Sequence, residues 1–91
     1  MAVNGYYEDE LQYKDKDSVL TIYFYVNCEK DSKDLNNQEV QFDNVCLINV
    51  ITEDGIELCD YRKYLPIAAR YFEKKVENKP ELVFERIKWD C

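Results

Sequence analysis

Apolar and polar residues alternate most regularly over residues 19–28, where β-branched and aromatic side chains predominate. Such residues favour strands, and successive side chains of a strand point to opposite faces. One face of this segment is entirely apolar and is predicted to lie in the core; it holds Leu20, Ile22, Phe24, Val26 and Cys28. The other face is amphipathic, with Thr21, Tyr23, Tyr25 and Asn27, and is expected to meet water, a partner or a second covering layer.

Two further segments are predicted to be strands. Residues 6–13 are a first strand in which Leu11 and Tyr13 share a face, and the polar residues 14–18 form the turn after it. Residues 40–52 are apolar on both faces, which predicts a central strand or one covered on both sides. The polar stretch 29–38 between strands is expected to be a mobile loop.

The end of the third strand and the start of the helical part carry turn and helix signals. Glu53-Asp54-Gly55 predicts a turn in which glycine has a positive φ, followed by a short strand over residues 56–58. Asp60 is a candidate helix cap. Because Pro66 lacks an N–H, either a short turn covers residues 60–65 or the main helix begins at Leu65 with Pro66 in its first turn.

The C-terminal third is predicted to be mainly helical. Leu65, Ala68, Phe72 and Val76 recur at helical spacing, and the helix is expected to end near Asn78. Residues 81–89 fit either a helix, capped by Asn78 with Glu81, or a strand, with a slight preference for helix.

These elements predict an α+β fold. Residues 1–91 are expected to form a single domain, in which an antiparallel sheet of three or four strands packs against one main helix plus a short C-terminal segment. The predicted core contains five side chains that should be buried together: Ile22, Phe24, Leu47, Ile48 and Phe72.

Charge is unevenly distributed over the 91 residues, whose net charge is −7. Residues 1–60 contain 14 acids and 4 bases, a net charge of −10, whereas the remainder is net positive by 3. An acidic chain is expected to avoid nucleic acid and acidic membranes and to favour basic partners. The first ten residues lack the basic and apolar regions of a signal peptide, so the expected compartment is the cytoplasm.

Little catalytic or metal chemistry is compatible with the composition. Without histidine there is no Ser-His-Asp triad and no imidazole base, and two isolated glycines make no phosphate-binding loop. The four cysteines, Cys28, Cys46, Cys59 and Cys91, form no C-x-x-C pair. We therefore expect reduced thiols, no metal, no cofactor and no enzymatic activity.

The candidate partner-binding residues combine carboxylates with tyrosine, a residue enriched at protein interfaces. Glu8 and Glu10 are expected to form a row along a strand, with Asp15 and Asp17 extending it. The full predicted set is Tyr6, Tyr7, Glu8, Asp9, Glu10, Asp15, Asp17, Tyr23 and Tyr25. Alternatively, the acidic residues serve only solubility, and the tyrosines are covered by another layer.

The small size, the acidic Tyr6-Tyr7-Glu8-Asp9-Glu10 segment, the lack of a catalytic set and the helical C-terminus resemble small bacteriophage anti-defence proteins of the anti-CRISPR kind. That resemblance implies stoichiometric inhibition of a basic, nucleic-acid-binding host protein or ribonucleoprotein complex in the host cytoplasm, with nucleic-acid mimicry as one route. It implies no direct binding to nucleic acid or membrane, and a monomer or homodimer. Two alternatives remain: an immunity protein or antitoxin that neutralises a basic nuclease toxin, and a small phage structural or assembly protein.

Overall fold

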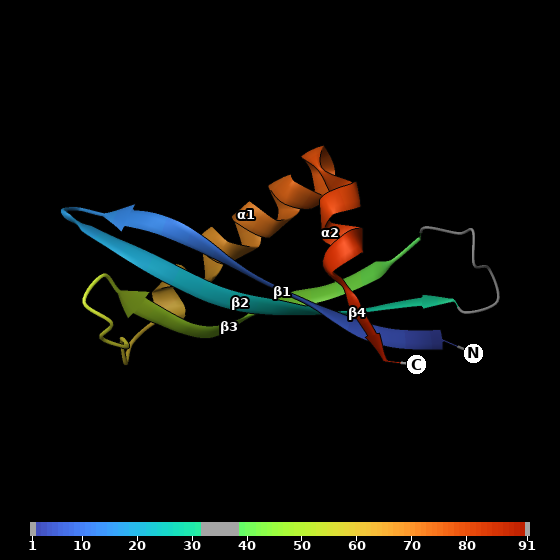
Figure 1. The fold of residues 1–91 in the computed structure, drawn as a ribbon, viewed down its shortest axis with the longest axis horizontal. Helices are drawn as coiled ribbons and strands as arrows, with labels where there is room; N and C mark the ends of the chain where they lie inside the picture. Colours follow the sequence, from blue (N-terminus) through green and yellow to red (C-terminus); the bar gives the residue numbers. More distant parts are fainter. Residues whose placement is uncertain (1, 32–38, 91) are drawn as a thin grey trace.

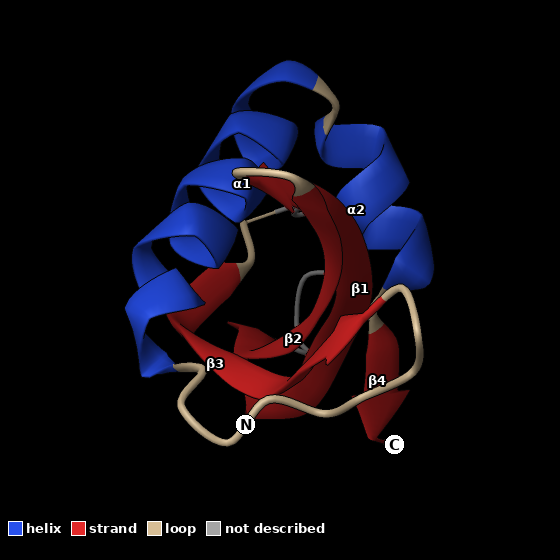
Figure 2. Ribbon diagram, turned by 90° about the vertical axis from the view of Figure 1, so that its left-hand side faces the viewer, coloured by secondary structure: helices blue, strands red, loops and turns tan. Residues whose placement is uncertain are grey.

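A computed structural model describes residues 2–31 and 39–90 and has an α+β architecture. Four strands form one antiparallel sheet in the order β3-β2-β1-β4. Their bounds are Ala2–Asp15 for β1, Ser18–Asp31 for β2, Gln41–Thr52 for β3 and Lys88–Asp90 for β4. A 3₁₀ turn, η1 (Arg62–Tyr64), leads into the helices α1 (Leu65–Asn78) and α2 (Pro80–Arg86). Both helices lie on the same face of the curved sheet (Figures 1 and 2), so the predicted fold class is confirmed.

Strands β1 and β2 form a long hairpin that extends from Ala2↔Asp31 to Asp15↔Ser18. The predicted turn is present and is tight, with Lys16 in the left-handed region at φ 59°. Both strands are longer than predicted, because polar residues at their ends also pair in the ladder. The first three residues of the expected loop 29–38 therefore belong to β2, and residues 32–38 lie outside the described residues.

The inner face of the sheet, which faces the helices, carries the core. All five residues of the apolar face of β2 are buried, as predicted, together with Val50, Tyr64, Ala68, Phe72 and Val83. Leu47 is partly buried and packs against this cluster. Ile48 was predicted to be in the core, and that prediction is wrong, because this side chain is 44% exposed. The ladder passes from Tyr23↔Asn49 to Phe24↔Leu47, so a β-bulge leaves Ile48 without an opposite residue and reverses its direction.

Strand β3 is an edge strand, contrary to the prediction of a central or doubly covered strand. Within the described residues it pairs with β2 on one side, and α1 packs against its inner face. Gly55 has φ 83°, which confirms the glycine turn after β3. The short strand expected at residues 56–58 amounts to a single bridge, Ile51↔Glu57.

The main helix begins at Leu65 with Pro66 in its first turn and ends at Asn78, as predicted, and the short turn η1 precedes it. The cap predictions are wrong: Tyr61 rather than Asp60 precedes η1, and Lys79 rather than Asn78 precedes α2. Neither position makes a side-chain cap hydrogen bond. The ambiguous tail contains both alternatives, since α2 ends where Ile87 turns extended and β4 follows.

Gly5 lets β4 approach β1 closely. A Cβ at this position would lie 2.7 Å from Cε3 of Trp89 and 2.8 Å from the backbone oxygen of Lys88. We expect Gly5→Ala to lower the free energy of unfolding by about 1–3 kcal/mol, because the rigid backbone must move to relieve the overlap. Urea unfolding followed by the fluorescence of the single tryptophan, Trp89, measures this loss. The control is Asn4→Ala, because Asn4 is exposed and its replacement should change the free energy of unfolding by under about 0.5 kcal/mol. Equal stability of the two variants would contradict the packing of β4 against β1.

Candidate partner-binding surface

The sheet face opposite the helices, here called the outer face, displays the candidate residues that alternate with the core. We define it by Tyr6, Glu8 and Glu10 of β1, Tyr23 and Tyr25 of β2, and Cys46 and Ile48 of β3. Successive side chains of a strand point to opposite faces, so these residues of β1 and β2 point outward because the residues next to them in the chain point into the core. Both helices pack on the inner face, so they leave the outer face uncovered (Figure 2).

The ladder brings carboxylates and tyrosines together on the outer face. Glu8 lies directly opposite Tyr25, and Glu10 lies opposite Tyr23. Side chains in such cross-strand pairs have Cβ atoms about 4.5–5.5 Å apart, so each glutamate lies within contact distance of the tyrosine opposite it. Glu8 and Glu10 are exposed, while Tyr23 and Tyr25 are half-buried. The outer face therefore offers an aromatic row flanked by a row of negative charge.

The outer face also contains residues that sequence reasoning missed. Tyr25 lies opposite Cys46, and a hydrogen bond with that thiol raises the pKa of Tyr25. Ile48 lines a hollow of about 170 Å³ together with Glu8, Glu10 and Tyr23, and Asp9 and Arg86 also line it. The ammonium of Lys88 lies 5.8 Å from the centre of the Tyr6 ring. Alternation along β3 could not identify Ile48 as exposed, because a strict two-residue period assumes a regular strand and does not predict the bulge.

Tyr7 and Asp9, two of the predicted binding residues, lie on the inner face instead. Tyr7 is fully buried and Asp9 is 8% exposed, so neither is accessible to a partner in this structure. Their ring and carboxylate belong to the core because they alternate with Glu8 and Glu10 along the same strand. The predicted acidic segment is thus split between the two faces of the sheet.

Asp9 forms the centre of a buried polar cluster. Its carboxylate accepts hydrogen bonds from Lys75 Nζ at 2.7 Å, Arg86 Nη1 at 3.1 Å, the backbone N–H of Glu10 at 2.8 Å, and the Tyr7 hydroxyl. Burial alone would raise the pKa of Asp9, but the bonds from Lys75, Tyr7 and Glu10 outweigh it and hold the pKa below its ordinary value. Burial and the bond to Asp9 raise the pKa of Tyr7 to about 12. The cluster ties β1 to both helices.

Asp15 and Asp17 do not continue the row formed by Glu8 and Glu10. Asp15 belongs to the inward-facing set of β1, and its carboxylate accepts a hydrogen bond of 2.9 Å from the Tyr64 hydroxyl. Asp17 lies in the hairpin turn and is exposed. The candidate carboxylates of the outer face are therefore Glu8 and Glu10.

The cysteines lie in three different environments in the part of the chain that the structure describes. Cys28 is buried, Cys46 is intermediate and Cys59 is exposed, while Cys91 lies outside the described residues. Burial, and secondarily the charge of Asp43, raises the pKa of the Cys28 thiol to about 11. Residues 2–31 and 39–90 contain no group of three or more Cys, Asp or Glu side chains arranged to hold a metal ion.

No family model, curated protein or solved structure matches this chain. Among the described residues, no helix has both the length and the apolar character needed to cross a membrane.

Proposed function

We propose that this chain is a stoichiometric inhibitor that binds a basic, nucleic-acid-binding host protein or ribonucleoprotein complex and occludes its nucleic-acid site, in the manner of an anti-CRISPR protein. The observation that carries the proposal is the pairing of Glu8 with Tyr25 and of Glu10 with Tyr23 on the face that the helices leave open. The net charge of −10 over residues 1–60, a stretch that includes the three long strands, supports a basic target.

The two kinds of side chain serve different steps of binding. Exposed carboxylates speed the encounter with a positively charged surface, because their attraction acts over about a Debye length. Tyrosines offer a large contact area with few rotatable bonds and so hold a formed complex together. A surface with this chemistry resembles the phosphates and bases of a nucleic acid closely enough to compete for a basic groove.

The first test is affinity capture from a bacterial lysate with matched variants and quantitative mass spectrometry. Glu8→Lys with Glu10→Lys alters the outer face, whereas Glu73→Lys with Glu77→Lys makes the same charge change at exposed positions of α1. We expect a basic nucleic-acid-binding protein to be captured by the parent and the helix variant and lost with the outer-face variant. Capture of a capsid or tail protein instead, or equal loss with both variants, would contradict the proposal.

Kinetics with the captured protein separate the two roles. We expect Glu8→Lys with Glu10→Lys to slow association by about tenfold or more at low salt, with the difference shrinking as salt rises. Tyr23→Ala and Tyr25→Ala should instead raise the dissociation rate by about 10–100-fold, as loss of desolvated contacts does. Surface-binding measurements at two salt concentrations check both effects. Unchanged association for the charge variant and unchanged dissociation for the tyrosine variants would exclude the outer face as the interface.

A further inference from the structure

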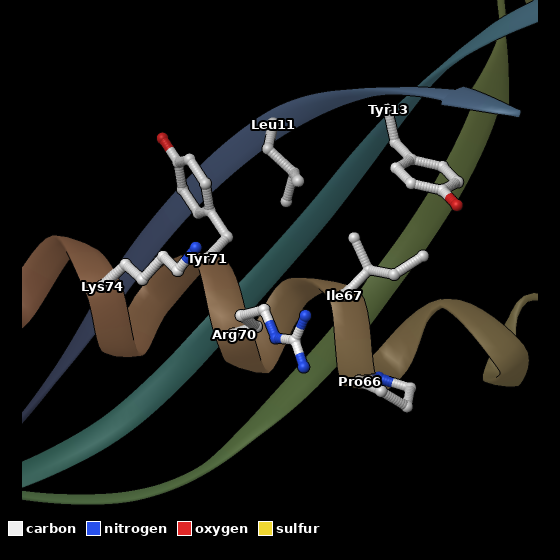
Figure 3. A pocket seen from close by; sticks show the side chains of 7 residues that line it. All are labelled: Leu11, Tyr13, Pro66, Ile67, Arg70, Tyr71 and Lys74. Carbon is white, nitrogen blue, oxygen red and sulfur yellow. The ribbon is translucent and has the colours of Figure 1, made fainter.

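A second candidate site lies on the other side of the sheet, in a groove between β1 and α1. The groove has a volume of about 550 Å³ and is lined by Leu11, Tyr13, Pro66, Ile67, Arg70, Tyr71 and Lys74. In Figure 3, Leu11 and Tyr13 reach from β1 toward Ile67 and Tyr71 of α1. None of these residues belongs to the outer face, so the groove is independent of the proposed function.

The groove combines an apolar lining with two cations. Arg70 and Lys74 are one helical turn apart on α1 and lie beside the apolar side chains. Both are exposed, and neither has an ion pair with a described residue, whereas Lys75 on the same helix is paired with Asp9. Two unpaired cations at the mouth of an apolar groove favour a ligand that brings both apolar surface and negative charge.

The edge of β1 beside this groove has no strand partner among the described residues. Strand β2 pairs with β1 along its whole length, but on the other side β4 covers only Asn4, Gly5 and Tyr6. From Leu11 to Asp15 the edge is therefore open to an additional strand. An extended peptide that pairs with such an edge gains main-chain hydrogen bonds, and its alternate side chains enter the adjoining pocket.

We propose that the groove and the open edge of β1 together bind an extended acidic segment of a partner protein by strand addition. Side chains of the added strand that share the inner face with Leu11 and Tyr13 point toward α1. An apolar side chain there packs on Ile67 and Tyr71. Acidic side chains at the next two positions of the same face pair with Arg70 and Lys74.

The spacing of the cations agrees with this pattern. Residues four apart on a helix are separated by about 6 Å along its axis, and same-face residues of a strand by about 6.6–6.8 Å. Nucleic acid would satisfy the cations as well, but the acidic strands around the groove oppose a polyphosphate far more than a segment with two carboxylates. An acidic peptide is therefore the favoured occupant.

The test uses a displayed library of eight-residue peptides in which threonine alternates with randomised positions. We expect selection on the whole chain to enrich two Asp or Glu residues at successive randomised positions, next to one large apolar residue. The best peptide, fluorescently labelled, should bind at least tenfold more weakly to Arg70→Glu with Lys74→Glu. It should also slow amide exchange in residues 11–15. A single-stranded oligonucleotide is titrated in parallel.

A matched control carries the same charge change elsewhere: Arg62→Glu with Lys79→Glu replaces two exposed cations outside the groove. This variant should bind the peptide within about twofold of the parent, and Ile67→Glu should lose binding while its thermal transition remains cooperative. The proposal would be overturned by any of three results: no enrichment of acidic residues, an equal loss of peptide affinity in the two double variants, or tighter binding of the oligonucleotide than of the peptide. The proposal would also be overturned if the free chain formed a dimer that excluded the peptide, and if the double variant Arg70→Glu with Lys74→Glu still formed this dimer.

Discussion

Truncation of Phe24 to alanine is expected to lower the free energy of unfolding by about 3–5 kcal/mol, a large part of the ~5–10 kcal/mol typical of a small domain. The Phe24 side chain is fully buried at the middle of β2. Its ring centre lies 6.2 Å from that of Tyr7, 6.0 Å from that of Tyr71 and 6.3 Å from that of Phe72. Removing the ring therefore leaves a cavity at the point where the sheet meets α1.

Phe72→Ala should cost a similar amount, since the Phe72 ring also contacts Phe42 at 5.1 Å between ring centres. Ile48→Ala is the matched control, because this apolar residue is 44% exposed and should cost less than about 1 kcal/mol. Urea unfolding at neutral pH measures all three variants. If Ile48→Ala destabilises the protein as much as Phe24→Ala, both the bulge in β3 and the direction of Ile48 are wrong.

Replacement of Asp9 by alanine is expected to lower the free energy of unfolding by about 2–3 kcal/mol at pH 7. Removing one partner of a buried ion pair costs about 3–5 kcal/mol, because the other charge stays unpaired. The loss is smaller here, since Lys75 and especially Arg86, whose side chain is 54% exposed, regain contact with water. Glu8→Ala, an exposed carboxylate on the same strand, is the control and should change stability by under about 0.5 kcal/mol.

The contribution of Asp9 also depends on pH in a defined direction. Its pKa is lowered in the folded chain, so its stabilising effect is complete above the unfolded value of 3.8. The effect is lost as the pH falls through the folded pKa. As the pH falls from 5 through the folded pKa of Asp9, the free energy of unfolding should therefore decrease more for the parent than for Asp9→Ala, which has no carboxylate at this position. Parallel stability curves of the parent and the variant over this range would contradict the buried cluster.

Strong alternation made much of the fold predictable. The apolar face of β2 identified five core residues correctly, because burial on one side of a strand imposes a period of two on the sequence. Pro66 fixed the start of α1 for a similarly local reason, since proline is tolerated only in the first turn of a helix.

The errors in the sheet arise where non-local pairing decides the structure. The position of β3 at the sheet edge depends on which strands β1 pairs with, and the apolar residues of β3 carry no such information. The three-residue strand β4 uses the space that Gly5 leaves for Trp89, and residues 88–90 alone do not indicate this contact.

For the candidate site, charge and tyrosine content singled out residues of β1 and β2, but they did not show how these residues divide between the two faces of the sheet. The period of two separates Glu8 and Glu10 from Tyr7 and Asp9 once the inner face of β1 is known. That Asp9 is the buried member depends on Lys75 and Arg86, which lie 66 and 77 positions away in the chain. A carboxylate that is compensated by such distant cations looks the same in sequence as one that is exposed.

The proposed occlusion is tested most directly by competition on the captured target. A labelled nucleic acid bound by the purified target is titrated with the parent chain and with Glu8→Lys with Glu10→Lys, at constant ionic strength. We predict that the parent displaces the nucleic acid completely, with an end point at one chain per nucleic-acid site. The outer-face variant should require at least tenfold more protein. A ternary complex, in which target, nucleic acid and parent chain remain bound together, would contradict the account.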